Sequence, residues 1–248
     1  MTTILRLLSA SAAVALLSAC GGGGGTSSPS PTTPPPSSTA PASTSTADLV
    51  AFVGSGATQT TLDSGVTRRA RNFSQDGKSG TVAVDRLAGT DIGLVQYRLG
   101  NDVFVYRLTG EPVASMTLPS GAYNGPLDMN YTLNGGDTWR VMSGEANLAL
   151  DMATGSVAIG GIAGNNRHSI EMFGDADLVD NRFVDRNTTL RLRNQEQGGT
   201  FMRDETGTVR GVTASHNGNQ AIFGTVAGAN ETSGFEARGG FTATLFQN

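Results

Sequence analysis

Short runs in which apolar and polar residues alternate cover most of the chain after residue 48, and turn-forming residues separate them. Alternation with a period of two is typical of strands with one buried face, whereas no segment of about a dozen residues shows the 3.6-residue period of a helix. Repeated short strands of this kind predict an antiparallel all-β fold. About eight of them follow Pro119, the number that fills a closed barrel with side chains. The expected strands are 80–87, 92–99, 102–108, 122–133, 139–150, 156–162, 169–178, 188–193, 209–214, 221–227 and 239–246.

One hairpin is expected around a two-residue turn at Gly100-Asn101, because this glycine can supply the positive φ of a primed turn. In that register Tyr97 faces Phe104, and Val95 faces Tyr106. One face would then be buried and the other exposed. The buried face would hold Val95, Tyr97, Leu99, Phe104, Tyr106 and Leu108, and the exposed face Gln96, Arg98 and Arg107.

Two later segments, 151–157 and 204–209, resemble each other. In both, an acidic residue begins a short stretch and Thr-Gly follows it. Glycine in a left-handed conformation suits a hairpin turn. Both segments are therefore predicted to be turns.

Residues 1–19 are predicted to be a secretion signal, with Arg6 before an apolar stretch at 7–17 that is too short to span a bilayer. Ordinary cleavage before Cys20 is disfavoured because Leu17 occupies a position that requires a small residue. Leu17-Ser-Ala-Cys20 instead resembles the lipobox of bacterial lipoproteins. The resemblance implies cleavage before Cys20 and attachment of fatty acids, such as palmitate, to the new terminus. The alternatives are a transmembrane anchor and a plain signal peptide.

Cys20 is the only cysteine, so no intramolecular disulfide can form. Three acyl chains on this residue would hold the protein to a membrane almost permanently. Gly21 stands where inner-membrane lipoproteins usually have Asp. By the same resemblance, the destination is the outer membrane of a Gram-negative cell.

Residues 20–47 are rich in Gly, Ser, Thr and Pro and carry no charge. Such a segment cannot bury enough apolar surface to fold, and it is predicted to be a disordered tether for the lipidated end. The remainder divides into a small β-rich region at 48–117 and a barrel at 118–248.

Three motifs in the region 120–248 resemble a known family. Tyr123-Asn-Gly125 opens the first barrel strand, 151–161 is a hairpin with Thr-Gly, and 221–227 with 239–243 resembles a closing strand pair. Together they are similar to the barrel domain of transferrin-binding protein B and its relatives, which are surface lipoproteins. The resemblance implies an eight-stranded antiparallel barrel preceded by a smaller sheet, the handle. Residues 228–238 lack the family's proline turn, so no ligand-binding residue is carried over.

The sequence shows no pattern of catalytic or metal-binding residues. His168 and His216 are not spaced as zinc ligands, and there is no Gly-x-Ser-x-Gly elbow or phosphate-binding loop. Asp63-Ser-Gly65 matches half of an aspartic protease site but has no second copy. We therefore expect no enzyme activity, metal or cofactor. The net charge of −4 argues against nucleic-acid binding.

A few polar and aromatic residues have two interpretations each. Arg68, Arg69 and Arg71, and likewise Arg191 and Arg193, are either solvated surface or a docking patch for an acidic partner. Trp139 is either packed against the barrel or an exposed anchor. His168 is either a polar loop residue or a haem ligand.

The sequence favours a non-enzymatic binding module on the outer membrane, exposed at the cell surface. Its ligand would be a host or environmental protein or a small solute related to iron or haem carriage, and a TonB-dependent receptor is a further expected partner. The alternative is a periplasm-facing structural lipoprotein that supports envelope assembly or an outer-membrane complex.

Overall fold

The computed structural model describes residues 40–54, 56–63, 65–112, 118–136 and 138–246. The predicted signal, Cys20 and the tether up to residue 39 lie outside the described residues. The described residues all fall within one compact unit of the chain. No helix in these ranges is long and apolar enough to cross a bilayer.

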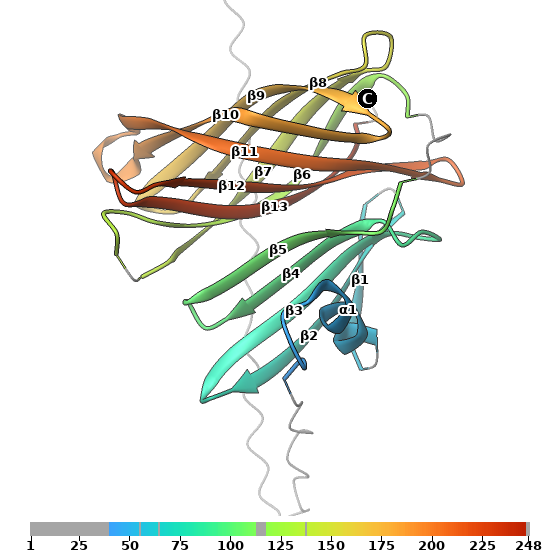
Figure 1. Ribbon diagram of the computed structural model, residues 1–248, viewed down its shortest axis with the longest axis horizontal. Helices are drawn as coiled ribbons and strands as arrows, with labels where there is room; N and C mark the ends of the chain where they lie inside the picture. Colours follow the sequence, from blue (N-terminus) through green and yellow to red (C-terminus); the bar gives the residue numbers. More distant parts are fainter. Residues whose placement is uncertain (1–39, 55, 64, 113–117, 137, 247–248) are drawn as a thin grey trace, which may run out of the picture. The chain divides into compact units, whose positions relative to one another are not determined.

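A five-stranded antiparallel sheet comes first, in the order β1-β2-β3-β4-β5. Eight antiparallel strands then close into a barrel in the order β10-β11-β12-β13-β6-β7-β8-β9, as Figure 1 shows. The all-β class, with a closed eight-stranded barrel after a smaller sheet, is therefore confirmed. The elements are α1 (Thr46–Gly54), β1 (Thr58–Asp63), β2 (Val66–Gln75), β3 (Lys78–Leu87), β4 (Gly93–Leu99), β5 (Val103–Thr109), β6 (Gly121–Thr132), β7 (Arg140–Asp151), β8 (Ser156–Gly164), β9 (His168–Val179), β10 (Arg182–Asn194), η1 (Gln195–Gln197), β11 (Thr200–His216), β12 (Asn219–Asn230) and β13 (Phe235–Leu245).

Helix α1 was not expected from the sequence, because its nine residues are too few for a clear helical period. Leu49 and Val53, one turn apart, are buried against an apolar cluster on one face of the sheet. The Ser45 hydroxyl accepts a hydrogen bond from the Asp48 backbone N–H (3.1 Å), which caps the helix start. The helix thus covers one face of the small sheet.

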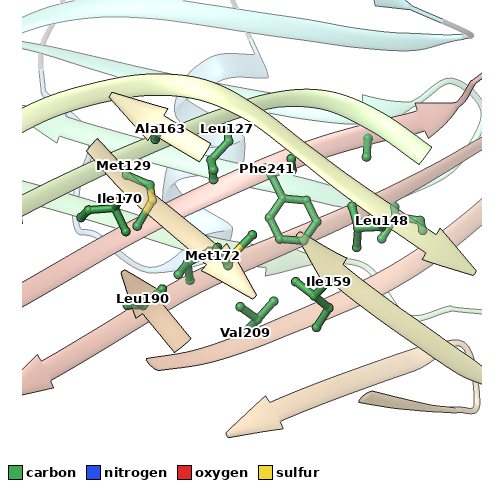
Figure 2. Close-up of a cluster of buried hydrophobic side chains, with 14 of the residues drawn as sticks. Leu127, Met129, Leu148, Ile159, Ala163, Ile170, Met172, Leu190, Val209 and Phe241 are labelled. Carbon is green, nitrogen blue, oxygen red and sulfur yellow. The ribbon is translucent and has the colours of Figure 1, made fainter. Parts of the chain in front are cut away.

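Alternate residues of the barrel strands point inward and fill the barrel. Figure 2 shows Leu127, Met129, Ile170, Met172 and Phe241 converging from different strands into one cluster. These side chains are 0% exposed. The barrel interior is therefore a packed apolar core, as is typical of eight-stranded barrels.

Two inward-facing glycines make room for aromatic rings in this core. A Cβ on Gly224 would lie 2.0 Å from Cζ of Phe241, and a Cβ on Gly211 would lie 2.0 Å from Cζ of Phe183. Each ring therefore covers the backbone of a neighbouring strand directly. This explains part of the high glycine content, because a glycine paired with an aromatic ring fixes the register between the two strands.

The predicted register of the hairpin between β4 and β5 is wrong by one residue. Leu99 pairs with Val103, so the loop has three residues and includes Asp102. A shift of one residue moves side chains to the opposite face. Tyr97 consequently faces Val105, while Phe104 lies on the other face of the sheet.

Of the two predicted Thr-Gly turns, one is confirmed and one is wrong. Gly155 lies between β7 and β8 with a positive φ of 67°. Gly207 instead lies inside β11, paired with Thr188 and Gly228. A Cβ on Gly207 would lie 2.7 Å from Leu190 Cδ1, so this glycine makes room for a core side chain and not for a turn.

We expect Gly224→Ala to destabilise the fold by about 1–3 kcal/mol, because the new methyl group would overlap the Phe241 ring and force it out of place. Urea unfolding of the purified protein measures this change. Gly54→Ala is a matched control, since nothing lies within 4 Å of a Cβ there. Equal stability of both variants would contradict the packing of this ring on β12.

Candidate functional site

The small sheet packs against the outer face of the barrel at β11, β12 and β13. A buried apolar cluster joins the sheet and the barrel. Gly240 of β13 allows the sheet to approach the barrel closely, since a Cβ there would lie 2.8 Å from Tyr106 and 2.9 Å from Leu94. The side chains come from both layers, so each layer buries the other's apolar surface. The cluster comprises Val66, Leu87, Ile92 and Leu94 of the sheet side with Val212, Ala214, Ala221 and Phe223 of the barrel.

A buried carboxylate lies at this junction. Asp85 of β3 is fully buried and accepts two hydrogen bonds from the guanidinium of Arg68, at 2.7 and 2.8 Å. The hydroxyl of Thr242 on β13 donates a third hydrogen bond to it, at 3.0 Å. The bond to Asp85 also raises the pKa of Arg68. This network ties the sheet to the barrel wall.

A hollow of about 300 Å³ lies beside this network and is lined by Asp128 and Asn130 of β6. The side-chain amide of Asn130 donates a hydrogen bond to the Tyr106 hydroxyl. Burial raises the pKa of Asp128, and the nearby Arg68 opposes this only in part. Burial also raises the pKa of Tyr106. Both groups are thus partly shielded from water at the seam.

On the other side of β5, two hollows of about 430 and 590 Å³ run between this strand and the barrel wall. They share Tyr106 and Arg107 of β5 with Arg210 and Thr225 of the wall, so they form one continuous groove. We call it the arginine groove. Its arginines are Arg107, Arg182, Arg186, Arg210 and Arg238.

Strand register brings these residues together on the outer wall. Val184 of β10 pairs with Arg210 of β11, which in turn pairs with Thr225 of β12. Arg210 alternates with the buried core residue Val209, so its side chain lies on the outer face of the barrel. The groove floor is therefore a row of outward-facing residues across three strands.

Three of the groove arginines carry uncompensated charge. Arg107, Arg186 and Arg210 make no ion pair within the described ranges, while Arg182 pairs with Glu111 and Arg238 with Glu236. The chain as a whole has a net charge of −4. The groove is thus a local concentration of positive charge on an acidic protein, which favours acidic ligands.

Trp139 lies next to the arginine groove. Its ring centroid is 5.9 Å from that of Phe104 on β5, and the guanidinium carbon of Arg238 lies 5.2 Å from the Trp139 ring centroid. The side chain is half-buried. It therefore packs on the edge of the sheet and on Arg238 of barrel strand β13, which is closer to the packed interpretation than to the exposed anchor.

The predicted basic cluster on β2 is used inside the protein. Arg68 binds Asp85, whereas Arg69 and Arg71 donate hydrogen bonds to the carbonyls of Gly54 and Phe52 at the end of α1, each at 3.0 Å. Cationic groups at a helix C-terminus satisfy its free carbonyls and its dipole. These arginines therefore hold the helix and the barrel to the sheet.

Arg191 and Arg193 of β10 are also paired. Arg191 forms an ion pair with Asp204 at 3.0 Å, and Arg193 with Glu171 at 2.7 Å. Arg191 additionally lies over the exposed rings of Phe173 and Phe201, at 5.4 and 6.0 Å from their centroids. Their charge is balanced locally, unlike that of the groove.

His168 begins β9 and is not in a loop. Its Nδ1 lies 2.6 Å from the Tyr131 hydroxyl, and burial lowers its pKa. His216 ends β11, and its ring packs directly on Gly89. A Cβ on Gly89 would lie only 2.3 Å from Nε2 of His216. Across the described residues, no three His, Cys, Asp or Glu side chains are grouped to hold a metal ion.

Cys20, the predicted lipidation site, lies outside the described residues and stays a prediction. The groove arginines were missed because they come from β5, β10, β11 and β13 and follow no common spacing. They come together only through the strand register of the barrel and the packing of the sheet on it. The one signal in the sequence is the repeated arginine at outward strand positions, such as Arg182 and Arg186.

Among solved structures, this chain is similar to structures of transferrin-binding protein B. A structure from Haemophilus parasuis is 10% identical, with a TM-score of 0.46, over 73% of this chain and 38% of its own. One from serogroup B Neisseria meningitidis is 16% identical, with a TM-score of 0.46, over 71% of this chain and 36% of its own. This chain spans less than two fifths of the length of those structures. No protein-family model and no curated protein sequence matches.

We expect Arg68→Ala to destabilise the protein by about 3 kcal/mol, because it leaves Asp85 buried without a counter-charge. Arg68→Lys should recover part of this loss, since a lysine keeps the charge but not the two-pronged geometry. Arg69→Ala is the control, with an expected cost of about 1 kcal/mol or less. Urea midpoints measure all three, and equal losses for Arg68→Ala and Arg69→Ala would contradict the assigned role of Asp85.

We expect Asp128→Asn to stabilise the protein at about pH 7 and to lose this advantage toward about pH 4. The pKa of Asp128 is raised in the folded state, so its contribution to stability is largest below its ordinary pKa of 3.8 and is lost as pH rises through the folded value. Thermal unfolding across this range measures the difference. Asp177→Asn, at an exposed position, serves as the control. A constant effect of Asp128→Asn at every pH would rule out this ionisation.

Proposed function

We propose that this protein is a lipid-anchored, non-enzymatic binding module of the outer membrane, displayed at the cell surface, and that its arginine groove binds an acidic protein partner. The observation that carries the proposal is the convergence of five arginines in one groove of an acidic chain. Three of them have no acidic partner within the described ranges. Positive charge of this kind attracts acidic surfaces and speeds association with them.

Two further features support a protein partner over a small enclosed solute. The barrel interior is packed with apolar side chains, so the ligand is expected outside the barrel. The groove combines arginines with the half-buried Tyr106, and Arg and Tyr are both enriched at protein interfaces. The partners that the family resemblance implies, an iron-carrier protein and a TonB-dependent receptor, are candidates for this groove.

The predicted lipobox and tether support attachment at Cys20 and distance from the membrane. We expect Cys20→Ser to release the protein from the membrane fraction, because the acyl chains supply the anchoring free energy. Protease added to intact cells should degrade the unaltered, anchored protein. Protection of the protein in intact cells, together with crosslinking to an envelope protein, would favour the structural alternative.

Binding is tested with polyglutamate as an acidic probe and the purified full chain. We expect saturable binding that weakens with added salt and falls about tenfold or more in the double variant Arg107→Glu and Arg210→Glu. The double variant Arg167→Glu and Arg191→Glu is the matched control, since it makes the same charge change at two residues outside the groove. Absence of binding at low salt, or equal loss in the control, would contradict the proposed site.

A further inference from the structure

Strand β5 is an open edge of the small sheet. It stands last in the strand order and pairs only with β4 among the described strands, and Figure 1 shows it at the sheet margin. Edge strands usually carry a proline, a bulge or several charges that prevent another chain from pairing with them. All seven residues of β5 pair in regular register, with no proline and one charge, Arg107. The opposite edge strand, β1, has a register irregularity after Thr61.

The free backbone groups of β5 can be identified from the hydrogen bonding of β4. The N–H of Gly100 donates to the carbonyl of Ser79 on β3. The backbone N–H and C=O groups of even-numbered residues of β4 therefore point toward β3, and those of odd-numbered residues point toward β5. The odd-numbered residues of β4 pair with odd-numbered residues of β5. The N–H and C=O groups of Phe104, Tyr106 and Leu108 therefore point away from β4. Phe104 is only 3% exposed, so the groups open to another chain are those of Tyr106 and Leu108.

These free groups lie along the arginine groove. Residues Phe104 to Leu108 line its two halves on the sheet side, and outward residues of β10, β11 and β12 line the other side. Thr225 of β12 and Arg210 of β11 line this groove opposite Tyr106, so the space beside β5 lies over β12 and β11. A strand paired with β5 would thus lie over Thr225 and Arg210.

We propose that an extended acidic segment of a protein partner adds to the sheet beside β5 and lies in this groove. The inference rests on the proposed function and names the partner's chemistry at the same site. Side chains of a strand alternate between faces, so acidic residues at every second position would face the barrel wall, where Arg210 and Arg186 lie. Arg107 pairs with Val95 and lies on the opposite face of the sheet. A phosphate or a lipid headgroup would use the arginines but not the free backbone groups, and the coincidence of both features selects a peptide.

The test uses two synthetic peptides of seven residues, the length of β5, with glutamate alternating with valine or threonine. In the second peptide, alternate backbone amides that would pair with β5 are N-methylated, which removes hydrogen bonds without changing the charge. Affinities are measured with the full chain, with Arg210→Glu and with the control Arg167→Glu. Hydrogen exchange of the backbone amides of β5 is followed with and without peptide.

We expect the methylated peptide to bind about tenfold or more weakly, because several backbone hydrogen bonds are lost. Exchange at Tyr106 and Leu108 should slow in the complex. Arg210→Glu should weaken binding of the unmethylated peptide, whereas Arg167→Glu should not.

Three results would overturn strand addition, and they separate it from the proposed function. Equal affinity for both peptides means that the groove binds charge alone, so the proposed function stands and strand addition fails. Tight binding that survives Arg210→Glu places the peptide elsewhere, and self-association of the chain through β5 that excludes the peptide makes a second copy the occupant. If polyglutamate and both peptides fail to bind, the proposed function fails as well.

Discussion

The arrangement of this protein depends on how one buried carboxylate is neutralised. Asp85 is fully buried where the sheet meets the barrel, and it is bound by Arg68 of its own sheet and Thr242 of the barrel. A buried charge costs several kcal/mol unless it is paired and hydrogen-bonded. The two layers are therefore stabilised in the arrangement that brings both partners to Asp85. The same arrangement places β5 over β13, and so creates the groove beside it.

The strands could be predicted because their alternation reflects a simple physical constraint, one face in the core and one outside. The errors occurred where loop length or packing decides the conformation. A third loop residue at Asp102 moved Tyr97 and Phe104 to opposite faces. Gly207, expected in a turn, gives space to Leu190 inside a strand. In both cases the local sequence permits either conformation, and contacts from distant strands select one.

The candidate site was less accessible to sequence analysis than the fold. Arg107 and Arg210 are far apart in the chain, and only sheet packing brings them to one groove. The conspicuous cluster Arg68 to Arg71 is instead consumed by internal bonds to Asp85 and to the end of α1. The adjacent charges Arg68 to Arg71 therefore serve the fold, while the distant Arg107 and Arg210 make no ion pair among the described residues. The predicted lipid attachment at Cys20 depends on a local motif that an enzyme recognises, and three-dimensional packing does not affect it.

The alternation of β11 has a consequence for how this protein can change over generations. Val209 packs in the barrel core, while the side chain of its neighbour Arg210 lines the groove on the outer face. A substitution at Arg210 can therefore change the chemistry of the groove while Val209 keeps its place in the core. A wall strand built in this way lets its outer surface diverge between generations separately from the interior.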